Sequence, residues 1–277
     1  MKLTCYNRHF PFVAILCLIT SSAWGQGQKS IEWAKFDFAP FFILQGPYKN
    51  EGTGDIIYKL LQQALPQYKH HNVLTNYKRI ARTNIEKTTI CTGTFKRKRT
   101  LKLYHFSNPV VTLPSHKLHY LKGSRAEELI NAAPKSLHNK LSLEALISTN
   151  PDIKIGLLKQ RRYGADINKI QQAYPQQFKY WAAGNGNINV TEMLRKNRVD
   201  FTLEFPSVSY YTNINDKPEQ LLKRQALTEN HPSLQTFIGC TKSPLGIRVI
   251  GQINSIVDEL KTTPDFQNAA IKWVPKN

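Results

Sequence analysis

The sequence predicts an α/β protein of two lobes, each a mostly parallel sheet flanked by helices. Three observations lead to this prediction. Apolar segments with strand character alternate with amphipathic segments along the chain, which is typical of parallel sheets covered by helices. The length of 277 residues is more than a single compact core usually needs. No linker-like or low-complexity tract divides the chain, so we expect the lobes to adjoin and to enclose a cleft.

The beginning of the chain has the features of a secretory signal peptide over residues 1–25. Lys2 and Arg8 give it a positive start, an apolar stretch (PFVAILCLIT) occupies residues 11–20, and residues 23–25 (AWG) place small residues where a signal peptidase cuts. We therefore expect cleavage after this segment and a periplasmic mature chain. The alternatives are a retained membrane anchor, for which the apolar stretch is only about half long enough, and a lipid-anchored protein.

The first half of the mature chain predicts alternating strands and helices. Aromatic and β-favouring residues at 30–43 (SIEWAKFDFAPFFI) predict a buried strand that leads into an aromatic loop. Residues 51–68 (EGTGDIIYKLLQQALPQY) predict a helix, because apolar residues recur at helical spacing until Pro66. The next segments predict, in order, a strand at 70–77, a helix at 76–87 and a strand at 88–94.

The same alternation continues with new elements after residue 110. Strands are predicted at 116–123, 152–160, 179–184, 198–205 and 234–240. Helices are predicted at 141–149, 161–174, 189–197 and 246–263. Asn189 followed by Glu192 has the form of a capping box, which predicts a helix start at Asn189.

Composition narrows the class of partner. The chain has 38 Lys and Arg against 19 Asp and Glu, and loss of the signal peptide lowers the net charge only from +19 to +17. Such a charge favours anionic partners or surfaces, but it does not identify a particular one. Nucleic-acid binding is not expected, because no known module and no interleaving of aromatic and basic residues is present. Nor does any motif call for a metal or a cofactor.

Residues 91–109 (CTGTFKRKRTLKLYHFSNP) contain four consecutive cations. A solvated surface is one interpretation of this cluster. A more specific one concerns Thr94 and Arg99, which are five apart and bracket a predicted turn from strand to helix. A hydroxyl and a guanidinium so placed can converge on one carboxylate.

This stretch and four others resemble, in the same chain order, the family 3 bacterial extracellular solute-binding proteins, which are of the periplasmic amino-acid-binding type. In that family a small or hydroxyl residue stands five positions before an arginine, and Phe-Ser-x-Pro follows. The other matching segments are FAPFFI with GTGDIIYKLL, KIGLLKQRRYG, RVDFTLEFPS, and FIGCTKS with the closing helix. The set covers nearly all of the mature chain and resembles a divergent subgroup.

The resemblance implies a two-lobed periplasmic-binding-protein fold of type II. Lobe 1 would comprise residues 26–111 and 234–277, and lobe 2 residues 112–233. It also implies a monomer that captures a small polar solute, an amino acid or a relative. The solute would be passed to an inner-membrane ABC permease or to a sensor receptor.

The resemblance assigns ligand-binding roles position by position. The assigned residues are Phe38 and Tyr77 as aromatic walls, Thr94 and Arg99 as the carboxylate grip, Glu204 opposite a ligand ammonium, and Arg162, Tyr163 and Gly164 on the lobe 2 side. Arg97 is a rival to Arg99, because consecutive cations replace the family's usual T-P-E-R. Glu204 stands where the family usually has Asp. Core packing is the alternative role for Phe38 and Tyr77.

Two cysteines remain after the signal peptide is removed, Cys91 and Cys240. Two cysteines in an oxidising compartment favour one disulfide. The alternative is two buried free thiols. The resemblance places both cysteines on neighbouring strands of lobe 1, which favours the disulfide if their Cα atoms lie within about 7 Å.

Two other functions compete with solute capture. One is a sensor or protein-binding module whose cleft is degenerate and whose positive surface binds an acidic partner. The other is an enzyme, because the fold also resembles that of secreted dehydratases acting on prephenate-like substrates. Glu204 or Tyr163 would then be the general acid. We expect a binding protein and no enzyme.

Overall fold

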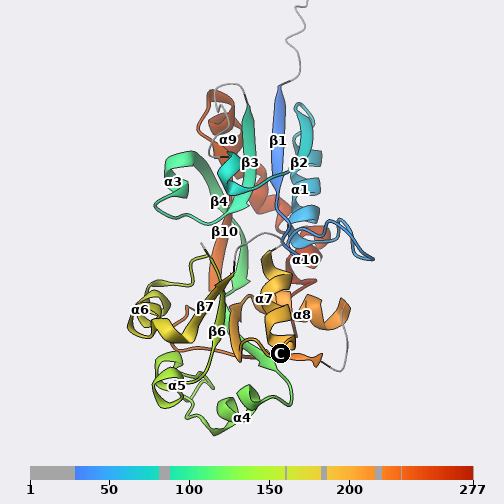
Figure 1. Ribbon diagram of the computed structural model, residues 1–277. Coiled ribbons are helices and arrows are strands. Elements are labelled where there is room, and N and C mark those ends of the chain that lie inside the picture. The colour runs from blue at the N-terminus through green and yellow to red at the C-terminus, as the bar shows by residue number, and fades with distance from the viewer. Residues whose placement is uncertain are drawn as a thin grey trace, which may run out of the picture.

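The computed structural model describes residues 29–80, 88–159, 161–181, 186–215, 220–231 and 233–276. The chain forms two five-stranded sheets, each flanked by helices, as the sequence predicted (Figure 1). We call the part around the first sheet lobe 1 and the part around the second lobe 2. The predicted signal peptide lies outside the described residues. Within the described ranges no helix has the length and apolar character needed to cross a membrane.

The lobe 1 sheet has the strand order β2-β1-β3-β10-β4. Strand β1 (Ser30–Lys35) pairs in parallel with β2 (Lys69–Leu74) and with β3 (Thr89–Thr94). Strand β10 (Ser233–Thr241) runs antiparallel between β3 and β4 (Tyr104–Pro114). The end of the chain therefore returns to the middle of the sheet that its beginning forms.

Helices flank the lobe 1 sheet, and the longer ones bury apolar residues in its core. The helices are α1 (Thr53–Ala64), α2 (Tyr77–Ile80), α3 (Thr100–Leu103), α9 (Pro244–Leu260) and α10 (Pro264–Ile271). In α1, Ile57 and Leu61, two of the apolar residues whose spacing predicted the helix, are buried. They pack in one core with Trp33 of β1 and with Val249 and Ile253 of α9. The spacing of apolar residues thus sets which helix faces meet the sheet.

The lobe 2 sheet has the order β7-β6-β8-β5-β9. Strand β6 (Ile155–Leu158) pairs in parallel with β7 (Phe178–Trp181) and with β8 (Phe201–Glu204). Strand β5 (Lys117–Leu121) runs antiparallel between β8 and β9 (Leu222–Gln225). The helical segments around this sheet are α4 (Arg125–Ala132), α5 (Leu143–Thr149), α6 (Ala165–Ala173), the 3₁₀ turn η1 (Pro175–Gln177), α7 (Gly186–Arg195) and α8 (Pro206–Asn215).

Some elements differ from the sequence-based expectation. The predicted helix start at Asn189 is wrong, because α7 already extends from Gly186. The sequence did not predict β4, α4, α8, α10 and β9. Of the helix predicted at 76–87, the structure has α2, and residues 81–87 lie outside the described part.

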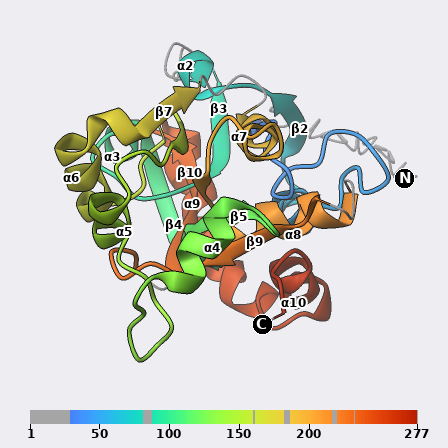
Figure 2. The same cartoon turned by 60° about the horizontal axis from the view of Figure 1, so that its bottom comes forward.

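Among the described residues, ring contacts join the lobes outside the sheets at two places. Trp273, which follows α10, lies edge-on to Tyr211 of α8 with ring centroids 5.1 Å apart. Its other neighbour is Tyr48 of lobe 1, at 5.2 Å, and its indole N–H donates to the Glu51 carbonyl at 2.9 Å. Figure 2 shows α8 beside α10. The second place is the candidate site described below.

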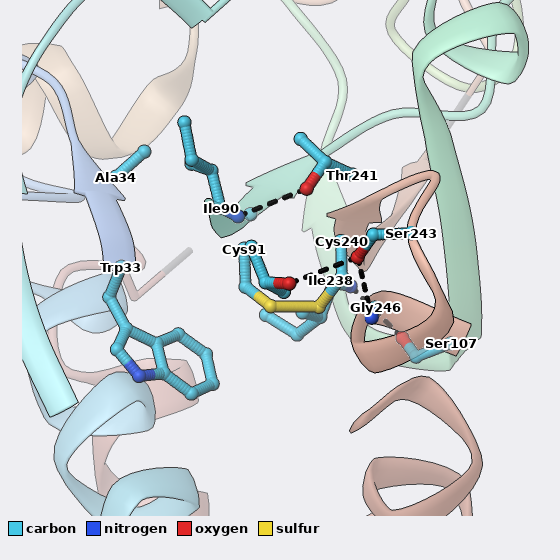
Figure 3. The surroundings of a disulfide bond; sticks show 12 residues. Trp33, Ala34, Ile90, Cys91, Ser107, Ile238, Cys240, Thr241, Ser243 and Gly246 are labelled. Atoms are coloured by element: carbon cyan, nitrogen blue, oxygen red, sulfur yellow. Dashed lines mark hydrogen bonds between the residues drawn. A yellow bond between two sulfur atoms is a disulfide. The ribbon is translucent and has the colours of Figure 1, made fainter. Parts of the chain in front are cut away.

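A disulfide joins the two central strands of lobe 1, so the predicted Cys91–Cys240 bond is confirmed (Figure 3). The two cysteines are direct partners in the antiparallel register of β3 and β10, with Cα atoms 4.0 Å apart, and both are fully buried. Beside them, the Ile90 N–H donates to Thr241 Oγ1 at 3.0 Å. The bond links residues 149 positions apart, and all of lobe 2 lies between them.

Candidate binding site between the lobes

Aromatic rings from both lobes meet at the ends of their strands. Phe205, directly after β8 of lobe 2, lies against three rings of lobe 1. The ring-centroid distances are 5.6 Å to Phe41, 6.2 Å to Phe38 and 6.4 Å to Phe95. On the lobe 2 side the imidazole of His116 lies 4.2 Å from the same Phe205 ring. We call these five residues the interlobe aromatic cluster.

The lobe 1 rings stand where parallel strands end. Phe38 and Phe41 lie on a tight turn after β1, in which the Phe41 N–H donates to the Phe38 carbonyl at 2.8 Å. Phe95 follows β3 directly. The carboxyl ends of parallel strands are the usual position of ligand sites in open α/β sheets. The lobe 1 half of the cluster is therefore at the end of the sheet where a ligand is expected.

Glu204, the last residue of β8, is held by a cation from its own lobe. Nη1 of Arg161 donates to both carboxylate oxygens of Glu204 at 2.6 Å, and the Phe205 N–H donates to Oε1 at 2.9 Å. The Glu204 side chain is 1% exposed and that of Arg161 16%. The Arg161 guanidinium also lies 5.2 Å from the Phe38 ring, across the lobe boundary. The pair therefore contacts both lobes.

Arg97 and Arg99 differ in their environments. The Arg97 guanidinium carbon lies 5.0 Å from the Phe95 ring of the cluster, and Arg97 is half-buried. Arg99 is exposed at the start of α3. Lys96 is also exposed, and its ammonium lies 4.2 Å from the Phe237 ring, which is not part of the cluster. Of the two proposed carboxylate anchors, Arg97 has the closer contact with the cluster.

Thr94 is buried as the last residue of β3, one position before Phe95. Tyr77 begins α2, but its side chain lies outside the described part of the structure. Phe38 has a role in the cluster that goes beyond packing within lobe 1, because its ring contacts Arg161 and Phe205 of lobe 2.

Comparison with known proteins defines the fold to which this site belongs. No family model matches the chain, and no curated protein matches it by sequence. Solved structures do match. An ancestral arginine-binding protein bound to arginine has a TM-score of 0.64 at 16% identity, with 90% of this chain and 99% of that chain covered. The probable amino-acid ABC transporter extracellular-binding protein of Bacillus subtilis has a TM-score of 0.61 at 14% identity, with coverages of 89% and 97%.

The chain has the two-lobed fold of the periplasmic amino-acid-binding proteins. A third neighbour is an ancestral amino-acid-binding protein described as a precursor of cyclohexadienyl dehydratase, with a TM-score of 0.60 at 15% identity and coverages of 90% and 96%. The low identities agree with a divergent form of this periplasmic binding fold.

In this binding-protein fold the RRYG segment leads from β6 to α6. Arg162 is exposed, whereas its neighbour Arg161 reaches Glu204. Tyr163 is buried, its Oη accepts the Leu158 N–H at 2.9 Å, and its ring lies 5.1 Å from His116. Burial raises the pKa of Tyr163 well above its usual value. Tyr163 is therefore a neutral hydrogen-bonding group at neutral pH.

His116 belongs to the cluster and lies in the short segment between β4 and β5. The side chain is 4% exposed, and within the described part of the structure its Nε2 has no hydrogen-bond partner. Burial lowers the pKa of His116 well below its usual value, and the nearby charges of Arg161 and Arg97 lower it further. The imidazole is therefore neutral at pH 7.

Sequence reasoning missed Arg161, Phe205 and His116. Each stands next to or within a segment that it did select: Arg161 beside Arg162, Phe205 beside Glu204, and His116 at the start of a predicted strand. One sequence signal for Phe205 was available. The aromatic segments of lobe 1 need an apolar partner on lobe 2, and Phe205 is an aromatic residue that directly follows the acidic residue at the end of a predicted lobe 2 strand.

Proposed function

We propose that the mature chain is a periplasmic solute-binding protein, a divergent member of family 3. It would capture a small polar solute, an amino acid or a related compound, between its lobes. The observation that carries this proposal is the contact of Phe205 in lobe 2 with Phe38, Phe41 and Phe95 in lobe 1. Its support is that solved neighbours of the same fold are amino-acid-binding proteins, one of them assigned to an ABC transporter.

The chemistry of the cluster suits a ligand with an apolar body and an anionic group. Aromatic rings from both lobes would cover the body, while Arg97 would bind a carboxylate, with Thr94 as a second donor. Bringing the lobes together removes water from these groups, and the hydrogen bonds of a guanidinium then compensate for the desolvated carboxylate. Lobe closure on a solute is the usual motion of such proteins.

The partners belong to the proposal as well. A monomer exported to the periplasm would pass its solute to an inner-membrane ABC permease or present it to a sensor receptor. The other proposed ligand contacts, Arg99, Tyr77 and Arg162, stay predictions. Arg97 is the preferred anchor in this account, because it contacts the cluster and Arg99 is exposed.

Two observations bear on the alternatives. The pairing of Glu204 with Arg161 favours the second candidate, a sensor whose cleft has lost its ligand, because the expected ammonium partner is already bound. An enzyme has less support. The same ion pair engages Glu204, and the raised pKa of Tyr163 makes its hydroxyl a weak acid at neutral pH.

A thermal-shift screen of the purified mature chain against amino acids, carboxylic acids, polyamines and sugars tests the proposal. A ligand at 100 times its Kd should add about 2.7 kcal/mol to the free energy of unfolding. The shift should be lost in Arg97→Ala and kept in the matched control Arg99→Ala. A thermal shift that is lost only in Arg99→Ala would show that Arg99, and not Arg97, binds the carboxylate. No shift with any solute, together with binding to an acidic envelope component, would favour the sensor.

A further inference from the structure

The charges around the interlobe aromatic cluster do not match a zwitterion. Among the described residues, the cluster is contacted by the guanidinium groups of Arg97 and Arg161 and by the Glu204 backbone and carboxylate. Glu204 is the acidic residue that would face a ligand ammonium. Both of its oxygens already accept hydrogen bonds from Arg161. Lys117 also lies opposite Glu204 in the β5–β8 register.

We propose that the site selects organic acids without an α-ammonium group, such as 2-hydroxy or 2-oxo acids with an apolar or aromatic side chain, because Arg161 occupies the place of the ligand cation. This inference rests on the proposed function and names its substrate class. Arg161 has the surroundings that a bound cation would have, namely a buried carboxylate and the faces of Phe38 and Phe205 at 5.2 and 6.0 Å.

An ammonium on the solute would meet an unfavourable environment here. It would either stand beside the Arg161 guanidinium with no free carboxylate, or displace Arg161 from Glu204. The first arrangement places an unpaired charge in a largely buried site and the second breaks a buried ion pair, and both are strongly unfavourable. A carboxylate meets the opposite situation, because Arg97 and Arg161 both favour negative charge.

His116 supplies the group that a hydroxy or oxo acid needs in place of the ammonium partner. Its ring lies on Phe205, its side chain is 4% exposed, and its Nε2 has no hydrogen-bond partner within the described residues. A buried polar atom of this kind usually has a partner in the functional complex. A hydroxyl or carbonyl oxygen can pair with a neutral imidazole without bringing a charge.

Matched pairs of solutes test this selectivity in calorimetric titrations of the mature chain. The probes are L-phenylalanine with L-phenyllactate, L-leucine with L-2-hydroxyisocaproate, and L-glutamate with L-2-hydroxyglutarate. We expect the wild type to bind the hydroxy acid of at least one pair about tenfold or more tightly than the amino acid. An equal or greater affinity for the amino acid in every pair that binds would overturn the inference.

Variants at Arg161 show whether this side chain sets the preference. Arg161→Gln frees the Glu204 carboxylate, so the preference should shift by about tenfold or more toward the amino acid. Lys159→Gln removes an exposed charge two positions away and should keep the wild-type preference. Arg161→Lys, which retains a cation beside Glu204, should keep it too. An unchanged preference in Arg161→Gln would overturn the inference.

A double variant covers the case in which Arg161→Gln does not fold. Arg161→Gln with Glu204→Gln contains no unpaired buried carboxylate, and it should still prefer the hydroxy acid because no carboxylate is left there to receive an ammonium. Loss of that preference in the folded double variant would contradict the assignment. Failure of the proposed function looks different: neither member of any pair, nor any solute of the wider screen, would bind the wild type.

Discussion

Arg161 and Glu204 form an ion pair in which one guanidinium nitrogen lies 2.6 Å from both carboxylate oxygens. Both residues belong to lobe 2, but the guanidinium also contacts the Phe38 ring of lobe 1. The same guanidinium therefore neutralises the buried Glu204 carboxylate and contributes to the contact between the lobes. Removing the Arg161 side chain should affect the stability of the protein as well as ligand binding.

Arg161→Ala should lower the free energy of unfolding by about 3–5 kcal/mol, because it leaves the buried Glu204 carboxylate without its cation. The matched change Arg162→Ala removes an exposed side chain and should cost no more than about 0.5 kcal/mol. Urea unfolding of both variants measures the difference. Equal effects of the two changes would mean that the pair does not hold Glu204 in solution.

Stability should fall when the pH is lowered from 7 to 5, in part because of His119. This side chain of β5 is fully buried, and burial, followed by the charge of Arg224, lowers its pKa to about 3. The unfolded chain binds a proton below pH 6.5 that the folded chain does not bind. This one residue should therefore cost about 2 kcal/mol between pH 7 and 5.

The control for this pH dependence is His119→Leu, which has no titrating group at that position. Urea unfolding measures how much the free energy of unfolding falls between pH 7 and pH 5. This decrease should be smaller in the variant than in the wild type by about 2 kcal/mol. His116, whose pKa is also lowered, should contribute in the same direction in both proteins. An identical decrease in the free energy of unfolding in wild type and variant would show that His119 is not a buried, neutral imidazole.

The Cys91–Cys240 bond should contribute strongly to stability, because it closes a loop that contains lobe 2. A loop of 149 residues corresponds to about 5 kcal/mol of restricted unfolded-state entropy in the chain-entropy treatment. Urea unfolding with and without a reductant measures the effect. Thiol titration of the denatured, oxidised protein should find no free cysteine, and two titratable thiols would contradict the bond.

Two glycines in α9 should respond to alanine in opposite directions. A Cβ atom at Gly246 would lie 2.1 Å from the Thr241 carbonyl oxygen, so Gly246→Ala should destabilise the protein by about 2 kcal/mol or more. A Cβ atom at Gly251 meets nothing within 4 Å, so Gly251→Ala should stabilise it by about 0.5–1 kcal/mol. Thermal unfolding measures the change in unfolding temperature of each variant relative to the wild type. Similar changes in both variants would contradict the close packing of Gly246 at the start of α9.

Much of the fold follows from local patterns in the sequence. The helix at α1 and the strand at β1 were predictable, because a stripe or run of apolar residues there has a single packing solution. By contrast, α8 (PSVSYYTNIN) has few aliphatic residues, and β9 (LKRQ) carries charges on a short strand. Tertiary contacts, rather than their own pattern, determine these elements.

The candidate site was predictable only as a set of segments. Arg161 and Arg162 are identical in chemistry, and the path of the loop between β6 and α6 decides which one reaches Glu204. That loop contains Gly164 at φ 116°, a backbone conformation that favours glycine. The meeting of Phe205 with Phe95 depends likewise on how the two lobes are placed, which no local pattern encodes.

Backbone hydrogen exchange tests whether a small solute binds between the lobes. Exchange is measured with and without the solute that raises the unfolding temperature most in the screen. We expect slower exchange in the presence of the solute on both sides of the interlobe aromatic cluster, at residues 38–43 and 95–97 of lobe 1 and around Glu204 and Phe205 of lobe 2. Protection confined to one lobe, or to segments remote from this cluster, would contradict it.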